Sequence, residues 1–592
     1  MPNWIQKEIG RFLKKSSFFI ALVLSLSSVI TSSSWVQAAE GIVDEGYIPP
    51  DLPLQGQVNI KFRDSSTQSL DAGAPYLAWK GNSAGWNGSE GTLLCTSTSD
   101  LNCKQESGTF EFFTRLSVCS SADSLDCLEG ISAKRAGVEI IGQFIEVFPK
   151  KINTTYLSKS SERLPEASSG GFWKFIGLEH KGGSDYFVDA GLRGSKTVKQ
   201  EQFTNTAFAL SIIAASKAPL GVHLSGGEPN SPIDDGSASV LQKFDEKTKR
   251  PFLGAVGIYP NYEGETLDCV MSGDGLCATR HAIPADVEFN MAVRLSSSPS
   301  GWMHGRLDNP TITIEALTPK PAVRLTIIGT TTRVPVIGIS QTWQSLPQNL
   351  KEIYSKGGFP GTTYGCRWCS EDPLKNTLVG SPPPSGSSSI AELKAWIPAV
   401  NDKASANINT WSIRTLSKSE MNGADKCFDK SNQINGVLMT NSTTYSAGPP
   451  AFKSGTLTYQ VAAPHFMSDG SVMRGQYNLV IRSEVARCIY GFSSAPINAE
   501  VSVVNANGEA QIATVIVGEK NGWLYLKANN FEFSAPIIKV KLSQEADPLA
   551  TPTPSASVKP VAKAVTITCI KGKTSKSVTA AKPKCPTGYK KK

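Results

Sequence analysis

The sequence predicts a mostly β protein, with two or three antiparallel β-sandwich-like domains, two short helices, a flexible linker and a small basic tail. Short runs of β-branched and aromatic residues recur from residue 56 to residue 542, and turn residues separate them at short intervals. This spacing is typical of antiparallel sheets and argues against an alternating α/β fold. The length between residues 39 and 546 exceeds what one core usually supports, so we expect several domains.

The N-terminal end has the pattern of an export signal. Basic residues from Lys7 onward precede an apolar run over residues 18–30, and small residues precede Ala38, as in a secretory signal peptide. Ser25 interrupts the run, which is shorter than the roughly 20 apolar residues of a membrane span. We therefore expect cleavage after Ala38 and a soluble mature protein that is secreted or extracellular and associated with the cell envelope.

The strand candidates follow the chain in short segments. They are residues 56–62, 110–118, 137–148, 186–192, 206–213, 287–295, 311–317, 323–328, 457–462 and 477–481. Four more β-type runs lie between residues 499 and 542, and Asn507-Gly508 and Asn521-Gly522 separate the first three. Because Asn-Gly suits the left-handed positions of a tight hairpin, this region is predicted to be a meander.

Two helices are expected, close together in the sequence. Ser345 is a candidate N-cap for a helix with Leu350 on its apolar face and Gly357 at its end. Ser389 and Glu392 have the spacing of a capping box at the start of the second helix.

Composition changes divide the chain into six predicted ranges. They are a signal peptide (1–38), an N-terminal β-rich region of one or two domains (39–318), a mixed segment with the two helices (319–434), a C-terminal antiparallel β domain (435–546), a Pro/Thr/Ser linker (547–560) and a lysine-rich two-cysteine tail (561–592).

Twelve cysteines in an exported chain indicate disulfides. Three pairs share one spacing across short polar loops, which predicts the local bonds Cys95–Cys103, Cys119–Cys127 and Cys269–Cys277. Cys569 and Cys585 are expected to close a loop in the tail.

The remaining four cysteines, Cys366, Cys369, Cys427 and Cys488, fit either two disulfides or a tetrathiolate zinc site. The wide spacing of the last two favours disulfides, with the connectivity open. No metal and no cofactor is predicted.

No catalytic residue is predicted either. The segment 81–85 fits the G-x-S-x-G pattern of serine hydrolases, but the chain lacks the strand-to-helix context that this pattern needs. The five histidines are scattered and are expected to be structural or surface residues.

Five tryptophans in Gly-rich or polar surroundings are candidates for stacking on a sugar ring or anchoring a protein partner. They are Trp79, Trp86, Trp173, Trp302 and Trp368. The favoured alternative is that these side chains are buried at the ends of β-sandwiches.

Charge is unevenly distributed. The formal net charge is +8, yet residues 551–592 alone hold ten lysines and no acidic residue, and the signal contributes +3, which leaves residues 39–550 at −5. An acidic body gives no electrostatic footprint for nucleic acid.

The tail is expected to tether the protein to an anionic wall polymer or a membrane surface, with an inert solubilising tail as the alternative. The lysines concerned are Lys571, Lys573, Lys576, Lys582, Lys584, Lys590, Lys591 and Lys592.

Three segments of the chain resemble segments of known proteins. Residues 567–592, 301–310 and 482–492 resemble large uncharacterised exported actinobacterial proteins with a lysine-rich, two-cysteine C-terminal module. The resemblance implies a bacterial cell-envelope or secreted setting and brings no activity or site residues.

The expected function is therefore binding or structural work in the envelope or outside the cell, with a polysaccharide or a surface protein as partner. The alternative is a secreted glycan-active enzyme on a β-sandwich scaffold. Such an enzyme needs two carboxylates at a set separation, which only the fold can place.

Overall fold

The computed structural model describes residues 57–62, 75–81, 92–101, 103, 107–151, 156–219, 239–244, 251–257, 269–359, 364–366, 378–380, 382–428, 433–493, 497–505, 509–511, 514–533, 536–544 and 565–592. The chain divides into two compact units. One comprises residues 1–492 and 497–543, here called the body, and the other comprises residues 493–496 and 544–592. The predicted signal peptide and linker lie outside the described residues.

The body is built on one large sheet, to which 21 strands of the described residues contribute. They are β1 (Gln57–Phe62), β2 (Tyr76–Lys80), β3 (Thr92–Leu94), β4 (Thr109–Arg115), β7 (Gln143–Val147), β8 (Gly171–Lys174), β9 (Asp185–Thr197), β10 (Thr204–Pro219), β11 (Ser239–Phe244), β12 (Pro251–Gly257), β13 (Cys269–Gly273), β14 (Leu276–Arg280), β16 (Gly301–Arg306), β19 (Thr332–Thr342), β20 (Tyr364–Cys366), β21 (Leu378–Gly380), β22 (Ala406–Thr415), β23 (Ile434–Thr440), β27 (Arg474–Arg482), β30 (Thr514–Lys520) and β31 (Trp523–Glu532).

Two smaller sheets cover parts of it. The five-stranded sheet contains β5 (Cys127–Arg135), β6 (Val138–Ile141), β15 (Glu288–Leu295), β17 (Asp308–Ala316) and β18 (Val323–Thr330). The six-stranded sheet contains β24 (Thr444–Tyr445), β25 (Ala451–Lys453), β26 (Thr456–Ala462), β28 (Ile497–Val504), β29 (Ala510–Gln511) and β32 (Ile537–Gln544).

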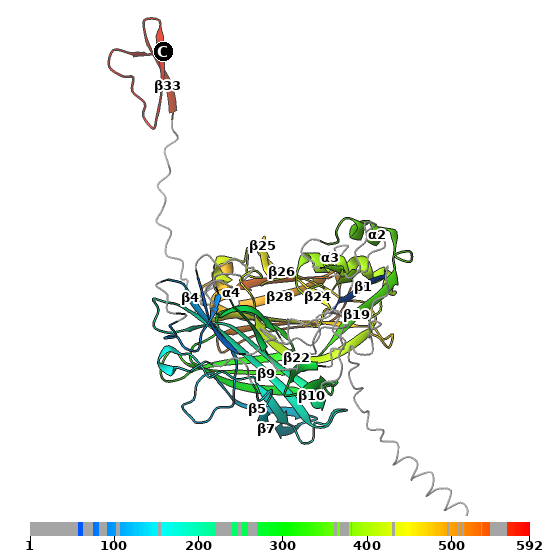
Figure 1. Cartoon of the computed structure of the whole chain (residues 1–592). Helices are drawn as coiled ribbons and strands as arrows, with labels where there is room; N and C mark the ends of the chain where they lie inside the picture. The colour runs from blue at the N-terminus through cyan, green and yellow to red at the C-terminus, as the bar shows by residue number, and fades with distance from the viewer. Residues whose placement is uncertain are drawn as a thin grey trace, which may run out of the picture. The chain divides into compact units, whose positions relative to one another are not determined.

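Alternate residues of the central strands serve two different cores. In β23, Val437 and Met439 pack into the core shared with the five-stranded sheet, whereas Leu438 packs into the core shared with the six-stranded sheet. Because side chains alternate along a strand, a strand covered on both faces is buried throughout, and all seven residues of β23 are buried. The polar Asn435 among them donates to the Phe428 carbonyl at 2.8 Å. In Figure 1, β26 and β28 lie above β22 and β5 lies below it. The predicted mostly β, sandwich-like fold class is thus confirmed.

The region from residue 499 to residue 542 is not the predicted meander. Its strands belong to two sheets, with β28 and β32 in the six-stranded sheet and β30 and β31 in the large sheet. The hairpin at Asn521-Gly522 is confirmed, because β30 and β31 pair on either side of it and both residues have positive φ, 52° and 77°. Asn507-Gly508 lies outside the described residues.

Three α-helices are described, namely α2 (Gln348–Ser355), α3 (Ser387–Trp396) and α4 (Ser483–Tyr490). The predicted caps are wrong. Pro347 is the N-cap of α2, and the Ser345 hydroxyl instead bonds the Thr342 carbonyl. Helix α3 begins before Ser389, and the Glu392 carboxylate is buried and accepts a hydrogen bond from Tyr354.

The predicted ranges 39–318, 319–434 and 435–546 all contribute strands to the large sheet. Strand β1 pairs with β19, β10 pairs with β22, and β16 pairs with β23. These pairings join residues before 319, between 319 and 434, and after 434, so the ranges do not form separate sheets.

Four disulfides are described, and they are Cys95–Cys103, Cys119–Cys127, Cys427–Cys488 and Cys569–Cys585. Cys277 is also disulfide-bonded, while the side chains of Cys269, Cys366 and Cys369 lie outside the described residues. The Cys427–Cys488 bond excludes a zinc site that uses all four of the remaining thiolates.

Within the described residues, no helix is long and apolar enough to cross a membrane. The tail forms a separate three-stranded sheet over residues 565–592, here called the tail module. Its strands are β33 (Val565–Lys571), β34 (Thr574–Ala580) and β35 (Lys590–Lys591).

Candidate functional sites

The tail module has almost no interior. Ile567 and Cys569, with exposed fractions of 8% and 0%, are the buried residues in this part of the described chain. A unit this small cannot bury enough apolar surface to fold alone and usually depends on a disulfide or a metal. The Cys569–Cys585 bond meets that need by joining β33 to the segment before β35.

The strand register gathers lysines on one face of the module. Lys576 of β34 and Lys591 of β35 both lie directly opposite Cys569 of β33. Directly opposed residues of antiparallel strands point to the same face, and Lys571 is two residues beyond Cys569 on that face.

All eight predicted tether lysines are exposed, and they are Lys571, Lys573, Lys576, Lys582, Lys584, Lys590, Lys591 and Lys592. The tail module contains no Asp or Glu. It therefore presents eight positive charges that no acidic residue of the same module neutralises.

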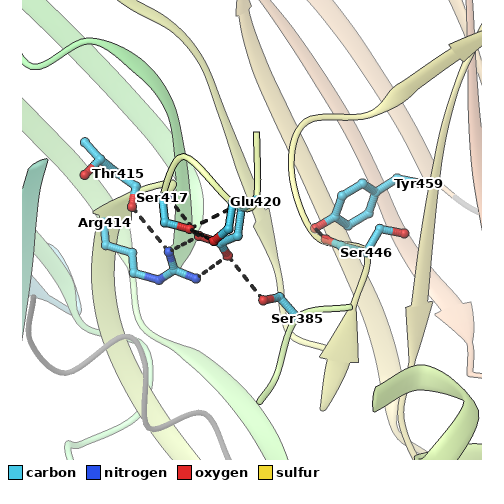
Figure 2. A network of polar contacts seen from close by, with 8 residues as sticks. Ser385, Arg414, Thr415, Ser417, Glu420, Ser446 and Tyr459 are labelled. Atoms are coloured by element: carbon cyan, nitrogen blue, oxygen red, sulfur yellow. Dashed lines mark hydrogen bonds and ion pairs between the residues drawn. The ribbon is translucent and has the colours of Figure 1, made fainter. Parts of the chain in front are cut away.

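A mostly buried ion pair joins β22 to the turn that follows it (Figure 2). The two terminal nitrogens of Arg414 donate to the two carboxylate oxygens of Glu420 at 2.9 and 2.8 Å. Ser417 and Ser385 donate to the same carboxylate. Burial opposes ionisation of Glu420, but the hydrogen bonds from Arg414 outweigh it and lower the pKa of this carboxyl.

This ion pair borders a hollow of about 820 Å³ that also includes Glu111, Arg193 and several hydroxyl side chains. Both oxygens of Glu420 are already used by protein donors, and Glu111 accepts from Lys80 at 2.9 Å. The acidic groups of this hollow thus stabilise the fold and have little capacity left for a ligand.

A second hollow, of about 690 Å³, contains two carboxyl groups. Asp126 and Glu166 line it together with Ser296, whose backbone N–H donates to Asp126 Oδ1 at 2.9 Å. Burial raises the pKa of Asp126 to about 6. Because Glu166 is exposed, the two carboxyl groups have different environments, as an acid and base pair requires.

Two of the five predicted stacking tryptophans are buried and not available to a ligand. Trp173 and Trp302 have exposed fractions of 4% and 1%, so the ligand-stacking prediction is wrong for them and the burial alternative is confirmed. Trp79 is half-buried against the core beside Gly108. Trp86 and Trp368 lie outside the described residues.

One buried histidine was not singled out by the sequence. His304 stacks on Tyr445 with ring centroids 3.9 Å apart, and neither of its ring nitrogens has a hydrogen-bond partner among the described residues. Burial, helped by the charges of Arg306 and Arg414, lowers the pKa of His304 well below its ordinary value. The sequence contained one signal for this residue. In a strand, His304 and Arg306 point to the same face as the apolar Trp302, which indicates that His304 is buried.

Comparison of the chain with family models, with curated proteins and with solved structures gives no match.

Proposed function

We propose that the protein is exported to the actinobacterial cell envelope, where the body has a binding or structural role and the tail module tethers it to an anionic wall polymer or membrane surface. The observation that carries the proposal is the set of eight exposed lysines on a disulfide-closed module without acidic residues. Export is supported by the signal-like N-terminal sequence and by the disulfides.

The tether acts by summed electrostatics. Each lysine near an anionic surface contributes up to about 1 kcal/mol, and the attraction fades within a Debye length of about 8 Å at physiological salt. Several lysines on one small module together hold the chain at the surface and release it as salt rises. Residues 39–550 have a net charge of −5, so the tail supplies the attraction.

The experiment compares the full-length chain with a chain that lacks residues 551–592, in cell-bound and medium fractions across a salt series. We expect the full-length protein to stay cell-bound at low salt and to be released as salt increases, and the truncated chain to enter the medium. A second variant with all eight lysines changed to Gln keeps the cysteines and separates charge from loss of the segment. Equal partition of all three proteins at low salt contradicts the tether.

A second candidate function, hydrolysis of glycans, is supported by the Asp126 hollow. A carboxyl group with a pKa of about 6, such as Asp126, can donate a proton to a leaving glycosidic oxygen, while the exposed Glu166 acts as the partner carboxylate. The test is glycan hydrolysis by the wild type and by Asp126→Asn, with Asp123→Asn as the matched control on the same hollow. Activity that survives Asp126→Asn contradicts this candidate.

A further inference from the structure

A third hollow lies on the body where β19, β22 and β27 meet the loop before β27. Its volume is about 500 Å³, within the range of small-ligand pockets. Its charged wall residues include Arg333, Asp286 and Arg474. Its other walls are amides, hydroxyls and methionines, so the surface mixes hydrogen-bonding and apolar groups.

Arg333 is the distinctive residue of this hollow. Its guanidinium makes one hydrogen-bond contact with the described residues, from Nη1 to the sulfur of Met467 at 3.5 Å. Among the described residues it forms no ion pair, whereas the neighbouring Arg474 pairs with Glu532 at 2.9 Å. A half-buried guanidinium with most of its N–H donors unused is suited to bind a carboxylate in a two-point fork.

Asn409 stands beside Arg333 on the adjacent strand. The two residues are direct partners in the antiparallel pairing of β19 with β22, so their side chains project from the same face. Asn409 donates its amide N–H to the Ile283 carbonyl at 3.0 Å. This bond fixes the side chain of Asn409, a residue that lines the hollow and whose carbonyl oxygen accepts no hydrogen bond from the described residues.

The floor of the hollow is held rigidly. Gln476 accepts a hydrogen bond from Thr332 at 2.7 Å and donates to Asp308 at 3.4 Å. Asp308 in turn accepts from Asn478 at 3.0 Å and from Lys527 at 2.9 Å. Because this network fixes β19 against β27, Arg333 and Asn409 are positioned before any ligand arrives.

One rim of the hollow is apolar and exposed. Phe466 and Val472 face each other across the loop and have exposed fractions of 40% and 42%. Val472 and Met473 line the hollow itself. An exposed aromatic ring beside a polar hollow offers the face on which a sugar ring packs.

We infer that this hollow binds a saccharide that carries a carboxylate, such as a uronic acid unit of an envelope polysaccharide. Arg333 binds the carboxylate, the Asn409 carbonyl and the Asp286 carboxylate accept sugar hydroxyls, and the Phe466 rim packs against the ring. The inference rests on the binding role that the proposed function gives the body, and it specifies the binding site and the chemical class of the ligand.

The experiment measures binding of the full-length protein to a uronic acid trisaccharide and to its neutral methyl ester by titration calorimetry. We expect one site on the protein for the acid and at least tenfold weaker binding of the ester, since a hydrogen bond to a charged group contributes about 1.5–3 kcal/mol. Arg333→Gln should weaken acid binding by about tenfold or more and leave ester binding unchanged.

Arg474→Gln is the matched control, because this arginine lines the same hollow but is already paired, and it should change the affinity by less than about twofold. The circular dichroism of each variant checks folding. Equal affinities for acid and ester, or equal losses in Arg333→Gln and Arg474→Gln, overturn the inference.

The tether proposal and the saccharide-site proposal can be disproved independently of each other. The variant with eight tail lysines changed to Gln should bind the trisaccharide like the wild type, whereas Arg333→Gln should still fractionate with cells at low salt. If the variant with eight tail lysines changed to Gln loses trisaccharide binding while Arg333→Gln keeps it, the proposed saccharide site in the hollow is wrong and the tether proposal stands.

Discussion

The body and the tail module reach stability by opposite means. The body buries the faces of its central strands in two large cores and packs α2 and α3 on a third. It also holds ion pairs with little exposure, such as Arg115–Asp189 and Arg414–Glu420. The tail module buries two residues and closes with one disulfide. The body is therefore stabilised by its packed cores, whereas the tail module is held together by its disulfide and exposes a high density of positive charge.

Removal of a central aromatic side chain should cause the largest loss of folding stability, and this loss should be confined to the body. Trp302→Ala should lower the free energy of unfolding by about 3–5 kcal/mol, since a fully buried indole leaves a cavity. The Trp302 ring packs edge-on against Phe428 at 4.8 Å and covers Gly436. Denaturant unfolding measures the loss, and the half-buried Trp79→Ala should cost less. Equal losses would contradict the layered packing.

The tail module should depend on its disulfide. Replacing both Cys569 and Cys585 with Ser removes about 3 kcal/mol of loop constraint from a unit without a core. We expect the amide protons of the module to lose protection from hydrogen exchange while the melting temperature of the body stays the same. Retained protection would show that two buried residues suffice to fold this segment.

The body should also be sensitive to acid through His304. The folded pKa of His304 lies well below its ordinary value of 6.5, so the folded state binds fewer protons than the unfolded state below that pH. Stability therefore falls as the pH falls below about 6.5, by up to about 1.4 kcal/mol per pH unit for this one group.

His304→Phe keeps a ring against Tyr445 and cannot take up a proton. Tyr445, Arg306 and Arg414 are unchanged by this substitution, so the difference between variant and wild type isolates the histidine. Denaturant unfolding at pH 7.5 and pH 5 should show a smaller acid loss for the variant. Parallel pH profiles would contradict the role of His304.

The hairpin between β30 and β31 should show the smallest effect. Gly522→Val should destabilise the body by roughly 1 kcal/mol or more, because a β-branched side chain is strained at a φ of 77°. Thermal melting measures this change, and Gly522→Asn, which tolerates positive φ, should cost less. Identical melting curves for the wild type and the two variants would argue against this turn.

Local patterns predicted some of the strands and some of the disulfides. The apolar runs gave strands such as β9, β10 and β15 but missed β22 and β23 of the large sheet. The short polar loops between paired cysteines gave Cys95–Cys103 and Cys119–Cys127, because these bonds depend on residues close together in the chain. Helix α4 was missed. Glu484 in its first turn and Gly491 at its left-handed C-cap were available as signals, but the strand run before it hid the boundary.

Long-range arrangement was not predictable. The run over residues 499–542 looks like consecutive hairpins, yet its strands alternate between two sheets because each pairs with a distant segment, β31 with β27 and β32 with β26. Arg333 and Asn409 are 76 residues apart in the sequence and meet only through the pairing of β19 with β22. No local spacing contains that information.

The most direct test of the account is the salt dependence of binding by the tail. Binding of the full-length protein to vesicles of anionic lipid is compared with binding of the variant in which the eight tail lysines are Gln. Neutral vesicles serve as the control surface. We predict that the logarithm of the affinity for the anionic vesicles falls steeply and linearly with the logarithm of salt concentration, and that the variant binds both surfaces weakly with little dependence on salt. Equal affinity and equal slope for the two proteins would contradict the claim that the tail module acts through its charge.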